Sequence, residues 1–77
     1  MNKPKLVEVE WVDSSSTPGW QSEIQKTPLT CYSAGYLIHK DKKGVVVALN
    51  RSPEALKNFG DTMTIPACCI IKIRNLR

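Results

Sequence analysis

The run KLVEVEWV, residues 5–12, alternates apolar with polar side chains, and it limits the fold more than any other segment of the chain. A period of two with β-branched residues is typical of a strand that buries one of its faces. Val7, Val9 and Trp11 lie in phase, so this pattern predicts that Trp11 points into a core. The whole chain has 77 residues, a length that predicts one domain, 1–77, with a thin core.

Two further runs predict strands. Residues 29–40, LTCYSAGYLIHK, are rich in aromatic and β-branched side chains, and Gly35 inside them marks a bulge or a sharp bend. Residues 41–44, DKKG, predict a tight hairpin turn. They lead into the continuous apolar run 45–50, which is typical of a strand in the interior of a sheet.

Residues 52–60, SPEALKNFG, are the one helix candidate. Ser52 is a suitable cap, Pro53 stands at the favoured first position, and Gly60 is a stop signal. The segment is long enough for one or two turns, and an irregular loop with a helical turn is the alternative.

The segment DTMTIPACCIIKIRNL predicts a short strand, a break at Pro66 and a last strand from about Cys69 to Arg74. Together with the runs above, it makes an all-β chain of five short strands, with a long first loop and a short helical turn. Small all-β chains avoid exposed edges by curling the sheet. We therefore expect a small five-stranded SH3-like or Sm-like barrel, whose last two strands are joined by a single 3₁₀ turn.

Composition excludes several classes of protein. No stretch approaches the ~20 apolar residues of a membrane span, and residues 1–10 lack the apolar core of a signal peptide. We therefore expect a cytoplasmic protein with no membrane partner. An odd number of cysteines, two of them adjacent, indicates free, buried thiols at Cys31, Cys68 and Cys69. Because there is one histidine and no C-x-x-C pair, we expect neither a metal nor a cofactor.

Catalysis is not indicated by any constellation of residues. His39 stands alone at the end of a predicted strand, which is typical of a solvated surface residue. Asp13 is followed by three serines, 14–16, and neighbours of this kind more often form a turn than a hydrolytic site. No glycine-rich phosphate loop is present. We expect a protein that is not an enzyme.

Ligand binding is better supported. Trp20 follows Pro18 and Gly19 outside the regular pattern, so it is either a lid on the core or an exposed binding aromatic. Aromatic side chains near a polar loop stack on nucleobases, and arginines hold phosphates with two donors. The candidate ligand-binding residues are Asp13, Ser14, Trp20, Tyr36, Arg51 and Arg74.

Apolar side chains on both faces of single strands indicate self-association. Tyr36 and Leu37 point to opposite faces of their strand, and so do Ile70 and Ile71. A thin core takes only one face of each strand, so the other face needs a cover. We expect a homo-oligomer formed by edge pairing or by back-to-back packing.

Three segments, VEVEWVDSSSTPGW, CYSAGYLI and DTMTIPACCIIKI, resemble a group of small, mostly uncharacterised proteins of bacteriophages and prophages. The shared pattern is V-E-W-x-D-S, G-W, C-x-S-x-G-x-L and I-P, and it covers most of the chain. The matching positions are Trp11, Asp13, Ser14, Gly19, Trp20, Cys31, Ser33, Gly35, Leu37, Ile65 and Pro66. The sequence departs from the pattern at Ala34 and in residues 52–60. The resemblance implies a phage accessory protein. By analogy with compact β-rich phage proteins, it would hold a nucleotide-derived immune signal of the host between its subunits.

The leading functional hypothesis is a non-enzymatic anti-defence protein, an oligomeric barrel in the host cytosol that sequesters a small nucleotide-like ligand. Asp13, Ser14 and Trp20 would line the pocket, with Arg51 or Arg74 on phosphate. The alternative is a nucleic-acid-binding barrel that uses its basic residues, Lys40, Lys42, Lys43 and the tail 72–77. A net charge of +4 attracts phosphates, although it also serves solubility alone. The third is a protein–protein module that inhibits a host enzyme or joins a virion component.

Overall fold

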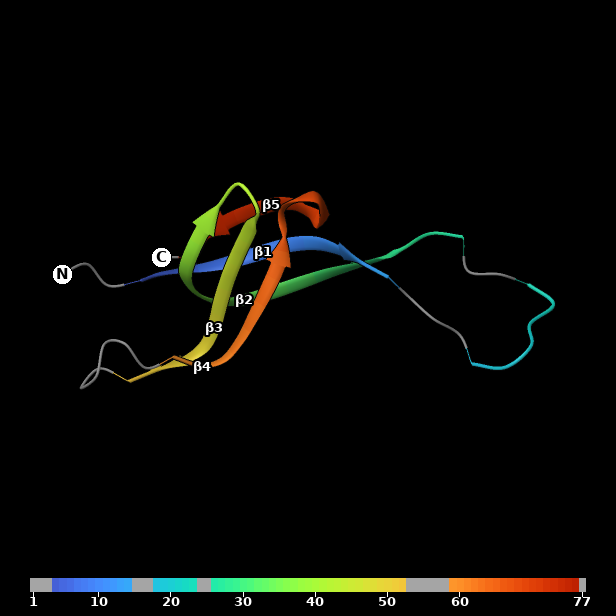
Figure 1. The fold of residues 1–77 in the computed structure, drawn as a ribbon, viewed down its shortest axis with the longest axis horizontal. Helices are drawn as coiled ribbons and strands as arrows, with labels where there is room; N and C mark the ends of the chain where they lie inside the picture. Colours follow the sequence, from blue (N-terminus) through green and yellow to red (C-terminus); the bar gives the residue numbers. More distant parts are fainter. Residues whose placement is uncertain (1–3, 15–17, 24–25, 53–58, 77) are drawn as a thin grey trace.

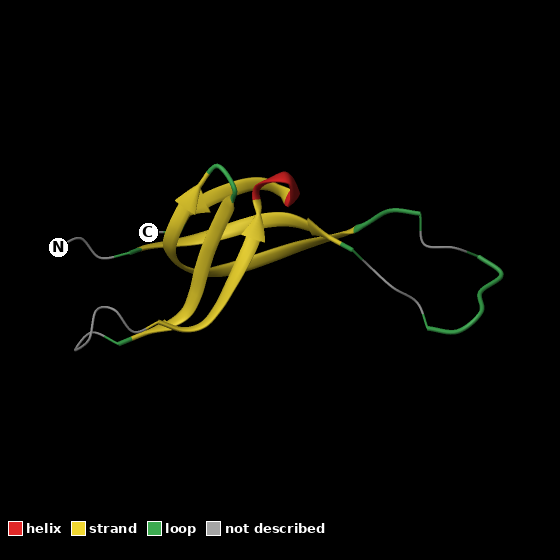
Figure 2. Ribbon diagram, viewed as in Figure 1, coloured by secondary structure: helices red, strands yellow, loops and turns green. Residues whose placement is uncertain are grey.

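The computed structural model describes residues 4–14, 18–23, 26–52 and 59–76, and the structural statements below concern these residues. They form five strands and one 3₁₀ turn (Figure 1 and Figure 2): β1 Lys5–Asp13, β2 Leu29–Asp41, β3 Gly44–Arg51, β4 Phe59–Pro66, η1 Ala67–Cys69 and β5 Ile70–Asn75. Within them, no helix is long and apolar enough to cross a membrane. The predicted all-β class is confirmed, and so is the 3₁₀ turn between the last two strands.

The five strands make one antiparallel sheet in the order β4-β3-β2-β1-β5. The long strand β2 joins its two halves, because it pairs with β1 over residues 29–37 and with β3 over residues 36–41. Figure 1 shows the sheet curling, and the amide of Ala67 in η1 donates to the carbonyl of Lys43 in the β2–β3 turn (2.8 Å). The predicted small SH3-like barrel is therefore the observed architecture, as an open sheet with β4 and β5 at its edges.

A close approach of β3 to β2 requires glycine at position 35. Gly35 is buried, and a Cβ built on it would lie 2.6 Å from the carbonyl oxygen of Ala48. A larger residue would push β3 away, because close-packed interiors have no room for such an overlap. The predicted bulge does occur in β2, but it lies between Leu37 and His39, where the register with β3 shifts. Gly35 therefore serves the close approach, and the bulge lies beyond it.

The core lies inside the curl of the sheet. Its buried side chains are Val7 and Val9 of β1, Val45 and Val47 of β3, and Ile65 of β4. Each contributes on the order of 1.5–3 kcal/mol by leaving water. Five partly buried side chains pack around them: Trp11, Leu37, Cys69, Ile70 and Ile73. The predicted inward phase of Trp11 is thus confirmed, and so is the predicted interior position of β3.

The predicted helix over 52–60 is wrong at its end. Phe59 and Gly60 belong to β4, where Gly60 pairs with Asn50 of β3. Pairing with β3 satisfies the backbone groups of these two residues. Gly60 therefore lies within a strand and does not end a helix. Residues 53–58, the rest of the candidate helix, lie outside the described residues.

The three cysteines are free, as predicted, but they are not buried. Cys31 and Cys69 are half-buried, and Cys68 is exposed. Cys68 and Cys69 lie on η1, a surface turn that carries the chain from one edge strand to the other, and Cys69 alone packs against the core. The last strand accordingly begins at Ile70, one residue later than predicted.

Candidate functional site

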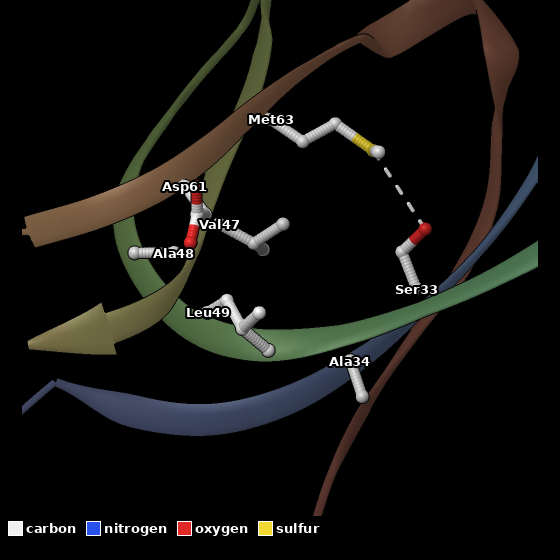
Figure 3. Close-up of a pocket in the computed structure, with 7 residues that line it drawn as sticks. All are labelled: Ser33, Ala34, Val47, Ala48, Leu49, Asp61 and Met63. Atoms are coloured by element: carbon white, nitrogen blue, oxygen red, sulfur yellow. Dashed lines mark hydrogen bonds between the residues drawn. The ribbon is translucent and has the colours of Figure 1, made fainter.

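An open hollow of about 270 Å³ lies beside the core, between β2, β3 and β4 (Figure 3). The residues that line it, called here the hollow, are Ser33, Ala34, Val47, Ala48, Leu49, Asp61 and Met63. The walls are mainly apolar because Leu49 and Met63 continue the inward phase of β3 and β4 beyond the buried core. Leu49 is 64% exposed and Met63 is 43% exposed, so both present apolar surface to solvent.

Two polar groups of the hollow are held in place by hydrogen bonds. The Trp11 indole nitrogen donates to the Ser33 hydroxyl (2.9 Å), which donates to the Met63 sulfur (3.7 Å). The Asn50 side-chain amide donates to the Asp61 carboxylate (2.9 Å). Asp61 has a φ of 54°, a left-handed conformation that aspartate adopts more readily than most residues other than glycine and asparagine.

Two of the predicted site residues are in contact. Arg51, at the end of β3, lies over the ring of Tyr36 in β2, with its guanidinium carbon 5.2 Å from the ring centroid. This is a cation–π geometry. The Arg51 Nε is buried and has no hydrogen-bond partner in the described part of the chain. Arg51 follows Leu49 by two positions, so this pair and the hollow share one end of β3.

Arg74, the other predicted phosphate partner, is engaged with two carboxylates. Its terminal nitrogens lie 3.3 Å from an oxygen of Glu8 and 2.5 Å from an oxygen of Glu10. The register of β1 with β5 places Arg74 opposite Glu8. The hydrogen bond to Glu10, and then the charges of both glutamates, raise the pKa of Arg74. Arg74 is therefore less available to a phosphate than Arg51.

Asp13 and Ser14 form a local turn at the end of β1. The Ser14 amide donates to the Asp13 carboxylate (2.8 Å), which is the turn arrangement that the sequence favours. Asp13 pairs with Leu29, whereas Tyr36 pairs with Leu6 near the other end of β1. Seven strand residues span on the order of 20 Å. The predicted site residues therefore fall into separate groups on one chain.

Trp20 is fully exposed, with a relative accessible area of 103%. Its neighbours form a local turn, in which Gly19 has a φ of 82° and the Gln21 side-chain amide donates to the Pro18 carbonyl (2.8 Å). Of the two alternatives that the sequence leaves open, the core lid is excluded. Trp20 is an exposed aromatic on the long connection between β1 and β2.

The remaining reactive groups lie away from the hollow. His39 is exposed, and its ring nitrogen is 2.8 Å from the Asp41 carboxylate in the β2–β3 turn. The sulfurs of Cys68 and Cys69 lie 3.9 Å apart, and their hydrogen bond raises the pKa of Cys69. Over residues 4–14, 18–23, 26–52 and 59–76, no three histidine, cysteine or carboxylate side chains are grouped as a metal site.

Sequence reasoning missed the hollow, although part of its signal is visible. Leu49 and Met63 continue the alternation that ends in buried Val47 and Ile65, so their apolar character indicates an extension of the inner face. Asp61 leaves no such signal, because its conformation and its bond to Asn50 depend on the pairing of β3 with β4.

Comparison of the chain with protein-family models, with curated proteins and with solved structures finds no match. The class of protein is therefore defined by the fold, a small five-stranded SH3-like barrel with an open hollow beside its core. Folds of this kind serve many functions, so the side chains have to indicate the function.

Proposed function

We propose that this protein is a non-enzymatic binding protein that sequesters a nucleotide-derived small molecule between copies of itself. The observation that carries this proposal is Arg51, which lies over Tyr36 at the end of β3 and has a buried Nε without a hydrogen-bond partner among the described residues. An arginine that an aromatic ring holds in position is suited to a phosphate, because the terminal nitrogens of its guanidinium bind phosphate oxygens in a two-pronged manner.

A site between copies is supported by the distribution of the candidate residues. Asp13 and Ser14 stand at one end of β1, whereas Tyr36 and Arg51 stand near its other end. A ligand as small as a nucleotide cannot reach both groups on one chain. Two copies can present the Arg51 end of one and the Trp20 loop of the other to the same ligand.

The resemblance to small bacteriophage proteins narrows the proposed ligand. A phage protein in the host cytosol has a use for removing cyclic oligonucleotides or ADP-ribose derivatives that signal infection. Binding without chemistry is sufficient for this role, because a tight complex lowers the free concentration of the signal. This anti-defence role rests on the resemblance, and the choice of a phosphate ligand rests on Arg51.

Titration calorimetry with a panel of cyclic di- and trinucleotides and ADP-ribose derivatives tests the proposal. We expect at least one ligand to bind. Replacing Arg51 with alanine should weaken binding roughly 10- to 100-fold, since a hydrogen bond to a charged group contributes about 1.5–3 kcal/mol. Arg51→Lys keeps the positive charge but lacks the paired donors of the guanidinium, so it should retain part of the binding. Lys72→Ala, at an exposed position of β5, is the matched control and should bind as the wild type does.

Absence of heat with every member of the panel would contradict the proposed ligand class. An unchanged affinity in Arg51→Ala would contradict the assignment of Arg51 as the residue that binds the phosphate. Native mass spectrometry of protein purified from its host is an independent check, because it reports the number of copies and any co-purified small molecule together.

Nucleic-acid binding is the second candidate, and exposed Lys40, Lys42 and Lys43 favour it. These lysines flank or form the β2–β3 turn, and a hairpin tip of this kind can contact a phosphate backbone. Affinity would then fall steeply with salt and would be abolished by Lys42→Glu/Lys43→Glu. The pairing of Arg74 with Glu8 and Glu10 engages one cation of the basic tail that this candidate also uses. Binding of a small nucleotide with a much weaker dependence on salt, and unchanged in Lys42→Glu/Lys43→Glu, would decide in favour of the first proposal.

A further inference from the structure

Two features have no partner among the residues that the structure describes. Trp20 presents its whole ring to water, and none of the described side chains fills the apolar hollow. A large aromatic side chain buries roughly 150–250 Å² when it finds a site. Tryptophan is enriched among the residues that contribute most to protein interfaces.

The hollow has room for an indole ring and offers it suitable contacts. Its volume of about 270 Å³ lies just below the ~300–1,000 Å³ of pockets for drug-sized ligands, so one large side chain can enter it. Leu49 and Met63 offer apolar contact, and methionine sulfur is a favourable neighbour for aromatic rings. An indole also needs an acceptor for its N–H. The Asp61 carboxylate supplies one, since the amide of Asn50 is bonded to a single one of its oxygens.

The same chain already uses this chemistry inside its barrel. The indole of Trp11 packs against the core and donates to the Ser33 hydroxyl, which also lines the hollow. A second indole in the hollow would lie beside the hydrogen bond from Ser33 to Met63 that Figure 3 shows, and the Ser33 hydroxyl also accepts from Trp11. The hollow is thus an extension of an interior that accepts tryptophan.

Trp20 and the hollow of one chain lie apart. The connection that carries Trp20 leaves the sheet where Asp13 pairs with Leu29. Figure 1 shows the described segment 18–23 of this connection extending far beyond the sheet, on the side away from the last residues of β3 and the first residues of β4. The molecule is accordingly long and narrow, 54 × 22 × 22 Å. A second copy is the occupant that presents the same indole to the hollow without bending the connection back.

We propose that Trp20 of one copy inserts into the hollow of a second copy, and that the second copy returns the contact, so that two chains form a two-fold dimer. Closed two-fold dimers are the commonest homo-oligomers, and each interface residue then counts twice. This inference rests on the self-association in the proposed function and assigns the residues that produce it. It also places the first loop of one copy beside β3 of the other, where Arg51 stands two positions from Leu49.

Sedimentation velocity over a range of micromolar concentrations tests this dimer. The wild type should sediment as a dimer, and Trp20→Ala and Met63→Asp should each weaken dimerisation at least about tenfold, as expected for a central aromatic contact and its pocket. Neither Trp20 nor Met63 is buried, so both variants should keep the fold, as judged by circular dichroism. Ile71→Asp, at another exposed apolar position on an edge strand, is the matched control and should dimerise normally.

Mixing the two weakened variants is the sharper test. Trp20→Ala retains an intact hollow and Met63→Asp retains the tryptophan, so one of the two contacts can form in a mixed dimer. The mixture should therefore show dimers at concentrations where each variant alone is monomeric. Mixed dimers that fail to form would overturn the reciprocal exchange.

Fluorescence identifies which side chain is buried on assembly. In Trp11→Phe, Trp20 is the only tryptophan, and its emission should shift to the blue and resist acrylamide as the dimer forms. The proposal is overturned by a single-chain mass at every concentration, by dimers that persist in Trp20→Ala, or by a blue shift in a monomer. If a monomer binds the ligand, the proposed dimer is wrong and the proposed ligand class stands. If the dimer forms and no ligand binds, the dimer stands and the ligand class is wrong.

Discussion

Trp11 and Trp20 carry the same side chain and have opposite environments. Trp11 stands two positions after Val9 in a strand, so the alternation of β1 turns it towards the core, where it is half-buried and bonded to Ser33. Trp20 follows a proline and a glycine in a connection between strands, and no regular alternation directs it inward. The side chain alone therefore does not decide burial; the phase of the backbone that carries it does.

Replacing Trp11 separates its two contributions to stability. Trp11→Phe keeps an aromatic ring against the core and loses the hydrogen bond to Ser33, so we expect a loss of about 1 kcal/mol in the free energy of unfolding. Trp11→Ala also loses the ring and should cost about 3 kcal/mol. Urea unfolding followed by circular dichroism measures both. Tyr32→Phe, at an exposed position, is the control, and equal effects of all three changes would contradict this assignment.

At the scale of elements, the turn between β2 and β3 is held by one carboxylate. An Asp41 oxygen accepts the backbone amides of Lys43 (2.8 Å) and Gly44 (3.2 Å), and the other oxygen contacts His39. The hydrogen bond from His39, followed by that from the Lys43 amide, holds the pKa of Asp41 below its ordinary value of 3.8. The ionised carboxylate is thus the form that the turn requires.

This turn should respond to acid in a defined direction. Because the pKa of Asp41 is lowered in the folded chain, its stabilising effect is complete above the ordinary value and is lost as pH falls through the folded pKa. His39→Ala removes the largest cause and should move the pKa of Asp41 upward. Carboxyl NMR titration of the two proteins measures this shift. An identical midpoint in both would show that His39 does not act on Asp41.

At the scale of the whole molecule, β2 decides how the sheet folds on itself. It pairs with β1 along its first part and with β3 along its last part, and Gly35 lies where these parts meet. The hydrogen bonds of one sheet therefore build both halves of the barrel. The core and the hollow are consequences of this one curled strand.

Substitution of Gly35 should therefore destabilise the whole fold. In Gly35→Ala the new Cβ would meet the Ala48 carbonyl at 2.6 Å, and moving β3 away should cost about 1–3 kcal/mol or more. Gly60→Ala is the matched control, since its Cβ would meet Asn50 at an ordinary 3.4 Å. Thermal unfolding of both variants tests this, with a lower melting temperature expected for Gly35→Ala alone. A loss in Gly60→Ala as large as that in Gly35→Ala would contradict it.

The shape of the molecule also relates its parts to the proposed function. The described segment 18–23, which carries Trp20, extends beyond one end of the sheet, and Arg51 with the hollow lies near the end of β3. These parts lie apart on one chain, whereas two chains related by a two-fold axis can bring them together. The proposed ligand site and the proposed dimer contact are therefore neighbours.

The sequence by itself determined the strands, because alternation is a local property. Residues 5–12, 29–40 and 45–50 lie within observed strands, and Pro66 precedes the predicted 3₁₀ turn. Only the tertiary structure decided that Arg51 meets Tyr36, that Arg74 is taken by two glutamates, and that a hollow opens at Asp61. These contacts join residues far apart in the chain, and they depend on register and on where the sheet curls. A bulge or a close approach moves them, and neither is encoded in the alternation of a single strand.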